Sequence, residues 1–313
     1  MNMKNVMVDH LKKYKAQNIK AISFLLSYLF FGVTGAICSF EWNWYVGQIL
    51  LAIFFFQSFI LLHEVGHYSF FKGKTLNTIF GHLFGFLSFI PFISWVDIHN
   101  QHHKWTGWRD KDPTTSGTIN PEHGLIVKSI INVCWFCFIP LFTLGYRIGN
   151  YWNLGKIKKF SPKTNRKKVT INLLIILITW AFISVLYSNI ILDYILPAYV
   201  LGLVISDLII LSQHSHIDIP ISNGEAVRPV KYSDQTQYTR SLKFGKWFEH
   251  WVLFNFNLHE KHHAFPGLPA YYLQKKECSE MNKRPFVNYF WNAKRMTGQE
   301  FVFSTTKYSD KTI

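Results

Sequence analysis

The stretch YVGQILLAIFFFQSFILLHEVGH, residues 45–67, joins an uncharged apolar run directly to a pair of histidines. A helix needs about 20 predominantly apolar residues to cross the ~30 Å hydrocarbon layer of a membrane. Residues 45–62 are close to that length, and similar apolar runs cover residues 21–38, 170–189 and 190–211. Soluble proteins rarely bury four such runs. The sequence therefore predicts an all-α, polytopic membrane protein with four transmembrane helices.

Positive charge is concentrated in two places. The formal net charge is +15, and lysines precede the first apolar run, while residues 147–169 hold eight lysines and arginines and no acid. Short loops rich in Lys and Arg stay on the cytoplasmic side of a membrane. Orientation and contact with anionic lipid explain this charge better than nucleic-acid binding, so no nucleic-acid partner is expected. We expect an integral protein of the bacterial inner (plasma) membrane.

Two more apolar stretches, residues 76–96 and 126–146, raise the question of how many times the chain crosses. If one of them crossed once, the basic 147–169 loop would change sides, against the charge rule. We therefore expect both to be re-entrant or interfacial helices within a single domain, residues 1–313. The remaining segments form a cytoplasmic cap made of residues 63–75, 97–125, 147–169 and 212–313.

The letters HEVGH at residues 63–67 also match H-E-x-x-H, the helical zinc site of metalloproteases. An intramembrane protease needs a third ligand, usually an Asp before Gly in a later span. Asp193 and Asp207 are the only acids in the last two runs, and neither precedes a glycine. We therefore predict that Glu64 orients a histidine ring through its free N–H instead of activating water.

Histidines are the strongest chemical signal in the chain. Ten of the fourteen fall in four short clusters, all predicted to face the cytoplasm, and these are HEVGH, HNQHH, QHSH and HEKHH. Positions i, i+3 and i+4 share one helix face, so each cluster presents several imidazoles to one region. A tetrahedral zinc ion takes four ligands, so the number of imidazoles suits two metal ions. The isolated residues, interpreted as structural or incidental, are His10, His82, His123 and His250.

The order of these clusters resembles a known family. HEVGHYSFF, GHLFGFLSFIPFISWVDIHNQHHKWTG, QHSHI and HHAFPGLPAYYL, which fall within residues 25–275, are similar to the histidine boxes and flanking residues of integral-membrane fatty acid desaturases. The likeness is closest to the acyl-lipid delta-12 and omega-3 type. It implies a non-haem di-iron centre, with His214 favoured over His216. The ligands that the resemblance implies are His63, His67, His99, His102, His103, His214, His259, His262 and His263.

The resemblance also implies the reaction, an O₂-dependent introduction of a C=C double bond into a fatty acyl chain by an oxidoreductase whose chemistry takes place at two iron ions. No other catalytic or cofactor-binding side chain is expected. The acyl carrier is left open between phospholipid, acyl-CoA and acyl carrier protein. No His-Pro-Gly-Gly motif occurs, so a separate electron donor such as ferredoxin or cytochrome b5 is expected.

Two rival functions remain open on the sequence. A membrane di-iron hydroxylase or ketolase, acting on fatty acyl, alkane or carotenoid substrates, would share the histidine boxes. A non-catalytic metal-binding membrane protein would need neither a substrate tunnel nor an electron donor.

An acyl chain has many equivalent methylene groups, so the protein must hold it in register in an apolar tunnel. The expected tunnel walls are Phe54, Phe55, Phe56, Phe59, Phe84 and Phe86. Side chains that could hold ligands or bridging water are Asp112, Asn255 and Asn257. Cations that could steer an acidic donor, or contact lipid head groups, are Lys104, Lys156, Lys158, Lys159 and Lys261.

Overall fold

A computed structural model describes residues 14–119 and 123–305, and almost all of its regular structure is helical. Within these ranges the only strands are β1 (Leu242–Lys243) and β2 (Arg284–Pro285), which pair in parallel. The predicted all-α class is confirmed. His10, interpreted above as incidental, lies outside the described residues.

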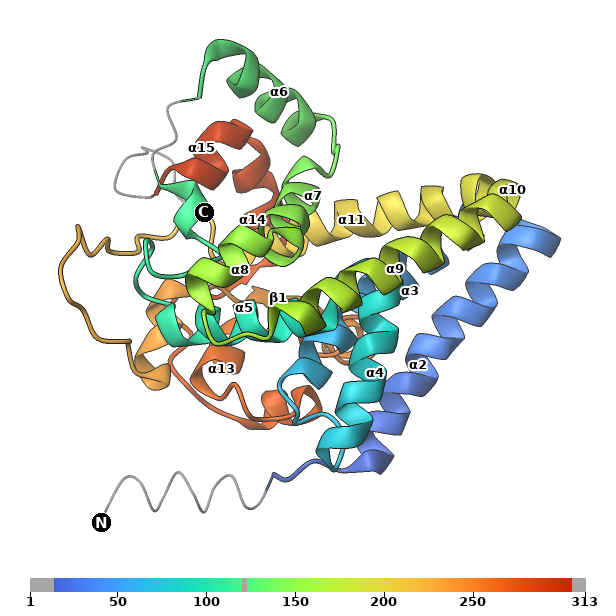
Figure 1. Cartoon of the computed structure of the whole chain (residues 1–313), viewed down its shortest axis with the longest axis horizontal. Helices are drawn as coiled ribbons and strands as arrows, with labels where there is room; N and C mark the ends of the chain where they lie inside the picture. Colours follow the sequence, from blue (N-terminus) through green and yellow to red (C-terminus); the bar gives the residue numbers. More distant parts are fainter. Residues whose placement is uncertain (1–13, 120–122, 306–313) are drawn as a thin grey trace.

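Four helices are long and apolar enough to cross a membrane, as the sequence predicts. They are α2 (Asn18–Ile37) extended by η1 (Cys38–Trp42), α3 (Trp44–Gly66), α9 (Arg166–Leu186), and a broken helix made of α10 (Ser188–Ile190), η4 (Ile191–Ile195), α11 (Leu196–Ile210) and η5 (Leu211–Gln213). The third run ends at Leu186, slightly before the predicted residue 189. In Figure 1 these helices slant away from α5 (Phe92–Trp105) and α13 (His259–Ala264).

The two outer turns lie together at the end of the molecule farthest from the histidines (Figure 1). The indole Nε1 of Trp44 donates to the carbonyl of Asp193 at 2.8 Å, and the rings of Phe40 and Tyr194 stack at 4.2 Å. Both helix pairs therefore turn at the same end. This arrangement agrees with two round trips that start from one side of the membrane.

The two additional apolar stretches form sharply bent helix pairs. α4 (Lys74–Leu87) and α5 (Phe92–Trp105) meet at 101°, and α6 (Leu125–Phe136) meets α7 (Leu141–Arg147), with η3 (Ile148–Trp152), at 112°. Each bend contains the same tripeptide, Phe-Ile-Pro, at residues 89–91 and 138–140.

The two bends are built in the same way. The phenylalanine has a left-handed φ, 54° at Phe89 and 58° at Phe138, and the following isoleucine N–H donates five residues back, to Gly85 and Cys134. That pattern is a Schellman cap, which ends a helix, and the proline that follows cannot continue the previous one. The identical capping explains why both apolar stretches turn back.

Both ends of the first bent pair, α4 and α5, lie beside clustered histidines. α4 begins shortly after His67, and α5 ends with His99, His102 and His103, whose rings meet those at the end of α3. The second pair packs on the first, since Ser94 Oγ donates to the carbonyl of Tyr151 at 2.7 Å and Arg147 donates to that of Ser88. We therefore propose that neither pair crosses and that the chain has four spans.

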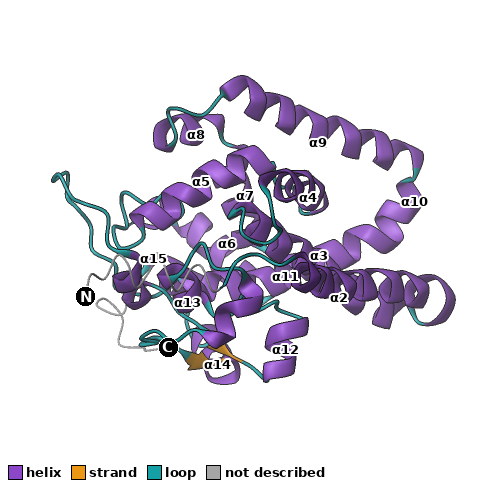
Figure 2. Cartoon of the chain, turned by 90° about the horizontal axis from the view of Figure 1, so that it is seen from below, coloured by secondary structure: helices purple, strands orange, loops and turns teal. Residues whose placement is uncertain are grey.

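The remaining elements form the cap around the histidines (Figure 2). In this layer η6 packs against α13, and α15 packs against α6. A second apolar cluster joins Trp135 of α6 to Tyr289 and Phe301 of the C-terminal helices. The cap elements are η2 (Ser116–Thr118), α8 (Leu154–Phe160), η6 (Tyr232–Tyr238), α12 (Lys246–Trp251), α13 (His259–Ala264), η7 (Ala270–Lys275), α14 (Phe286–Lys294) and α15 (Gly298–Phe303).

The topology can be tested by thiol labelling of single cysteines in a cysteine-free background. Glu41→Cys lies in the outer turn, Lys163→Cys in the basic loop and Gly124→Cys between the two bent pairs, where an added Cβ meets no atom within 4 Å. Lys163→Cys and Gly124→Cys should react with an impermeant reagent from the cytoplasmic side, and Glu41→Cys from the other. If Gly124→Cys reacted from the same side as Glu41→Cys, each bent pair would cross the membrane.

Candidate metal centre

The histidines come from helix ends that meet on one side of the spans. His63 and His67 close α3, and three more occupy the last two turns of α5. His214 follows η5 at the end of the fourth span, and α13 carries the last three. Histidines three or four residues apart on one helix lie on the same face, whereas adjacent histidines such as His102 and His103 point in different directions. The helix ends thus bring imidazoles together from four distant parts of the sequence.

Nine of these rings form two groups, and within each group every residue offers one ring nitrogen that lies within 4.8 Å of those of the others. Group one contains five residues, which are His63, His67, His99, His103 and His262. Group two contains four, which are His102, His214, His259 and His263. The nine are the residues singled out from the sequence. His216 is buried, belongs to neither group, and has a left-handed φ of 54°.

Close contacts within each group are between Nε2 atoms. The Nε2 of His99 lies 3.0 Å from those of both His67 and His103, and the Nε2 of His103 is also 3.0 Å from that of His262. An imidazole nitrogen carries either one proton or one lone pair, so it cannot form two such hydrogen bonds at once. The nitrogens therefore converge on a shared point in a way that hydrogen bonding alone does not satisfy.

The spacing carries information about coordination. An imidazole nitrogen lies about 2.0–2.1 Å from a bound zinc ion, so ligands at right angles are about 3.0 Å apart and tetrahedral ones about 3.4 Å. Five of the six close Nε2 pairs in the two groups are 3.0 Å apart and the sixth is 3.3 Å. The five members of group one exceed the four ligands of tetrahedral zinc, whereas group two has four members.

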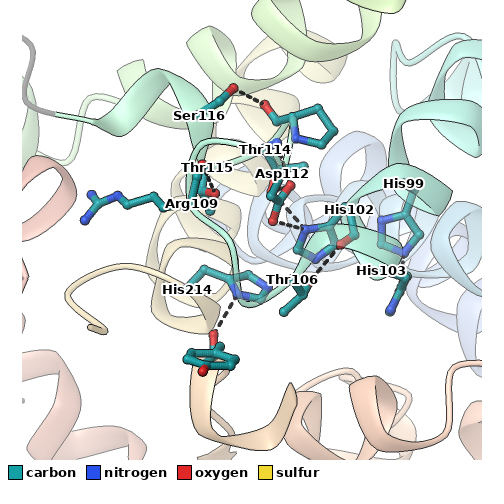
Figure 3. Close-up of polar contacts among 12 residues, drawn as sticks. His99, His102, His103, Thr106, Arg109, Asp112, Thr114, Thr115, Ser116 and His214 are labelled. Carbon is teal, nitrogen blue, oxygen red and sulfur yellow. Dashed lines mark hydrogen bonds and ion pairs between the residues drawn. The ribbon is translucent and has the colours of Figure 1, made fainter. Parts of the chain in front are cut away.

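Outer hydrogen bonds orient several of the rings. His214 Nδ1 must be protonated, because it donates to the carbonyl of Tyr238 at 3.1 Å, and its Nε2 then carries the lone pair. Glu64 accepts from His63 Nδ1 at 3.0 Å, and Asp112 accepts from His102 Nδ1 at 2.7 Å (Figure 3). Glu64 has the orienting position expected from the sequence.

Burial keeps the rings in the neutral form that binds metal. It lowers the pKa of His259, His262 and His263 well below the usual range, and neighbouring imidazoles lower it further. Burial alone would raise the pKa of Asp112, but His102 and a hydrogen bond from that ring outweigh it and leave the pKa lowered. The lowered pKa favours the ionised carboxylate, which accepts from His102 Nδ1.

Other residues predicted from the sequence have different roles. Asn255 and Asn257 donate to the carbonyls of Ala270 and Leu242, so they shape the loop before α13 rather than touch a ligand ring. The three isolated histidines that the structure describes all lie outside both groups. His82 contacts Phe92, His123 contacts Gln299, and His250 contacts Phe24.

A mostly apolar cavity of about 460 Å³ adjoins both histidine groups. It lies between the loop after α5 and the α6–α8 segment, and the ends of α3 and α11 close it. Of the phenylalanines predicted as tunnel walls, only Phe59 lines this cavity, so the prediction was wrong for the other five. Phe54 instead stacks on Tyr28, and Phe86 stacks on Trp180.

Fold and site together define a polytopic helical membrane protein that carries a buried, histidine-rich metal-binding centre beside an apolar cavity. The sequence model for fatty acid desaturases matches residues 41–291. The chain therefore belongs to the fatty acid desaturase family, and it is an oxidoreductase. Hydroxylation or ketolation, left open by the histidine boxes, is not favoured by the relatives.

Named relatives agree with this family. The chain is 26% identical over 259 residues to an sn-1 oleoyl-lipid 12-desaturase of Picosynechococcus sp., covering 75% of this chain and 69% of that protein. It is 25% identical over 277 residues to an omega-3 fatty acid desaturase of Caenorhabditis elegans, covering 83% and 65%. A 92-residue segment is 33% identical to an sn-1 acyl-lipid omega-3 desaturase (ferredoxin) of Nostoc sp., covering 28% and 26%. The matches thus span about two thirds of the first two relatives.

Replacing Asp112 should weaken metal binding without unfolding the cap. In Asp112→Asn the charged acceptor for His102 Nδ1 is lost, and loss of such a partner typically lowers metal affinity about 10–100-fold. Chelator competition on the purified protein measures the change. Asp110→Asn is a matched control, because Asp110 bonds Ser222 and no histidine. Equal metal affinity in the two variants would contradict the role given to Asp112.

Proposed function

We propose that the protein introduces a C=C double bond into a fatty acyl chain and that its nine clustered histidines hold two iron ions for this reaction. One observation carries the proposal: the apolar cavity and the histidine centre share a wall. His63 and His99 of group one line the cavity, together with three members of group two, which are His102, His214 and His259. A substrate in the cavity would lie against both groups.

The ligand set supports iron. Imidazole is a good ligand for Fe, Zn, Cu and Ni, and the five members of group one exceed the four ligands that tetrahedral zinc takes. Iron held there would supply the O₂-dependent oxidising chemistry that an unactivated methylene requires, since such a group offers nothing for an acid, base or nucleophile to attack.

The protein's own side chains hold the rings and exclude water. Trp95 stacks on His99 with ring centroids 4.2 Å apart, and Phe256 packs edge-on against His63 at 5.1 Å. Both aromatic residues also line the cavity. They therefore fix the imidazoles and provide an apolar surface against which the acyl chain is kept in register at the reacting carbons.

The cavity also contains cations suited to an anionic head group. Arg109 and Lys156 line it, and burial lowers the pKa of both. Arg109 contacts Thr118 through Nε and Nη2, and Lys156 forms no ion pair among the described residues. Phospholipids, acyl-CoA and acyl carrier protein all carry phosphate. We therefore infer that the substrate is an acyl chain on a phosphate-bearing carrier.

The reaction needs electrons from a separate protein, and the Nostoc relative is named for ferredoxin. Lys104, Lys158 and Lys159 are exposed and remain suited to steer an acidic donor. Lys261 is not, because it is buried and lies 3.7 Å from Glu280. With the basic loop in the cytoplasm, the centre would face the cytoplasm from the bacterial inner membrane.

Expression in a host with a simple lipid profile tests the proposed reaction. Mass spectrometry of fatty acid methyl esters should show a new double bond with the wild-type chain and none with His102→Ala, which removes a ring of group two. His82→Ala, which changes an exposed ring that belongs to neither group, should leave the product intact. A hydroxy or keto product from the wild-type chain would refute desaturation.

Head-group recognition can be tested on α8, where two lysines differ in surroundings. Lys156→Gln should raise KM about tenfold with little change in kcat, the effect of losing one charge-assisted hydrogen bond. Lys158→Gln changes an exposed residue on the same helix, and with a saturating electron donor it should leave the KM for the acyl substrate unchanged. Steady-state assays of purified protein in lipid vesicles make the measurement. If both substitutions change KM alike, the effect comes from surface charge and not from the cavity.

A further inference from the structure

The two histidine groups are connected by a neutral side chain that no sequence motif predicts. Gln235 lies on η6 and is 0% exposed. Its Nε2 donates to the carbonyl of His103 at 2.8 Å and to that of Val230 at 3.3 Å. Its Oε1 accepts from Nδ1 of His263 at 2.9 Å. His103 belongs to group one and His263 to group two.

The orientation of this amide is fixed by its partners. Two backbone carbonyls can only accept, so the amide nitrogen must face His103 and Val230, and the oxygen must face His263. An amide oxygen only accepts, so Nδ1 of His263 must carry the proton. The lone pair of His263 is then on Nε2, which lies 3.0 Å from His259 and 3.3 Å from His102.

We propose that Gln235 is a positioning residue of the metal centre. It selects the metal-binding tautomer of His263, and it ties that ring to the backbone of α5, the helix that carries His99 and His103 of group one. The same helical segment supplies the carbonyl of Tyr238 to His214, so η6 orients two of the four rings of group two. This inference rests on the proposed function, since it requires metal at the nine histidines.

The experiment compares three variants of the full chain, purified in detergent and loaded with ferrous iron. Gln235→Leu removes all three hydrogen bonds of the side chain, and Gln235→Glu keeps an oxygen acceptor for His263. Gln237→Leu is the matched control, because Gln237 is exposed on the same helical segment and donates only to the carbonyl of Asp234. Iron per chain is measured after dialysis against graded chelator, and Mössbauer spectra of isotopically enriched iron report each site. Size-exclusion chromatography and circular dichroism report folding.

Gln235→Leu should lose iron from one of two sites, with about 10–100-fold weaker affinity there, the usual cost of removing a partner that orients a ligand. Gln235→Glu should restore that site, and Gln237→Leu should match the wild type. A purely structural role would weaken both sites alike or give no rescue by Glu, and either result would overturn the inference. Two unchanged sites in Gln235→Leu would overturn it as well. A wild-type chain that binds no iron would instead reject the proposed function, and this inference with it.

Discussion

Nine imidazoles gather at the site, seven of them buried and two half-buried, and in eight of them Nε2 lies 3.0–3.3 Å from that of a neighbouring ring. This arrangement is unfavourable in the absence of a cation, because lone pairs face one another in a site of low dielectric constant. The rest of the chain has to hold them there. Their polar nitrogens would otherwise turn toward separate partners, so the fold must fix helix ends, ring rotations and protonation states together. Much of the architecture can be understood as meeting this requirement.

The spans and the cap are joined by polar contacts close to the site. Gln57, inside α3, donates to the carbonyls of Trp251 and Val252, and this contact holds the segment before α13 against the first histidine pair. Glu64 accepts two hydrogen bonds: one carboxylate oxygen accepts from His63 Nδ1, and the other accepts from the backbone N–H of Ala270. These contacts place α13 against α3 although the two are separated by about two hundred residues in the chain.

The two Phe-Ile-Pro bends position the second histidine cluster and the substrate cavity. Because the α4–α5 pair turns back by 101°, the end of α5 returns to the end of α3, and the His-x-x-His-His face meets His63 and His67. The second bend brings the α6–α8 segment over the same site and leaves the apolar cavity beneath it. Metal centre and substrate cavity thus depend on the same local capping chemistry, used twice.

The amino-acid sequence alone determined the four apolar spans, the four histidine clusters and the orienting position of Glu64, because hydropathy, helical periodicity and adjacency depend on near neighbours. Only the tertiary structure decided how the nine rings divide into groups of five and four, why His214 rather than His216 joins them, and which side chains wall the cavity. Gln235 could not be found from the sequence at all. Its contacts reach across 28 and 132 positions, and a single glutamine in a polar loop has no periodicity or motif that reveals such partners.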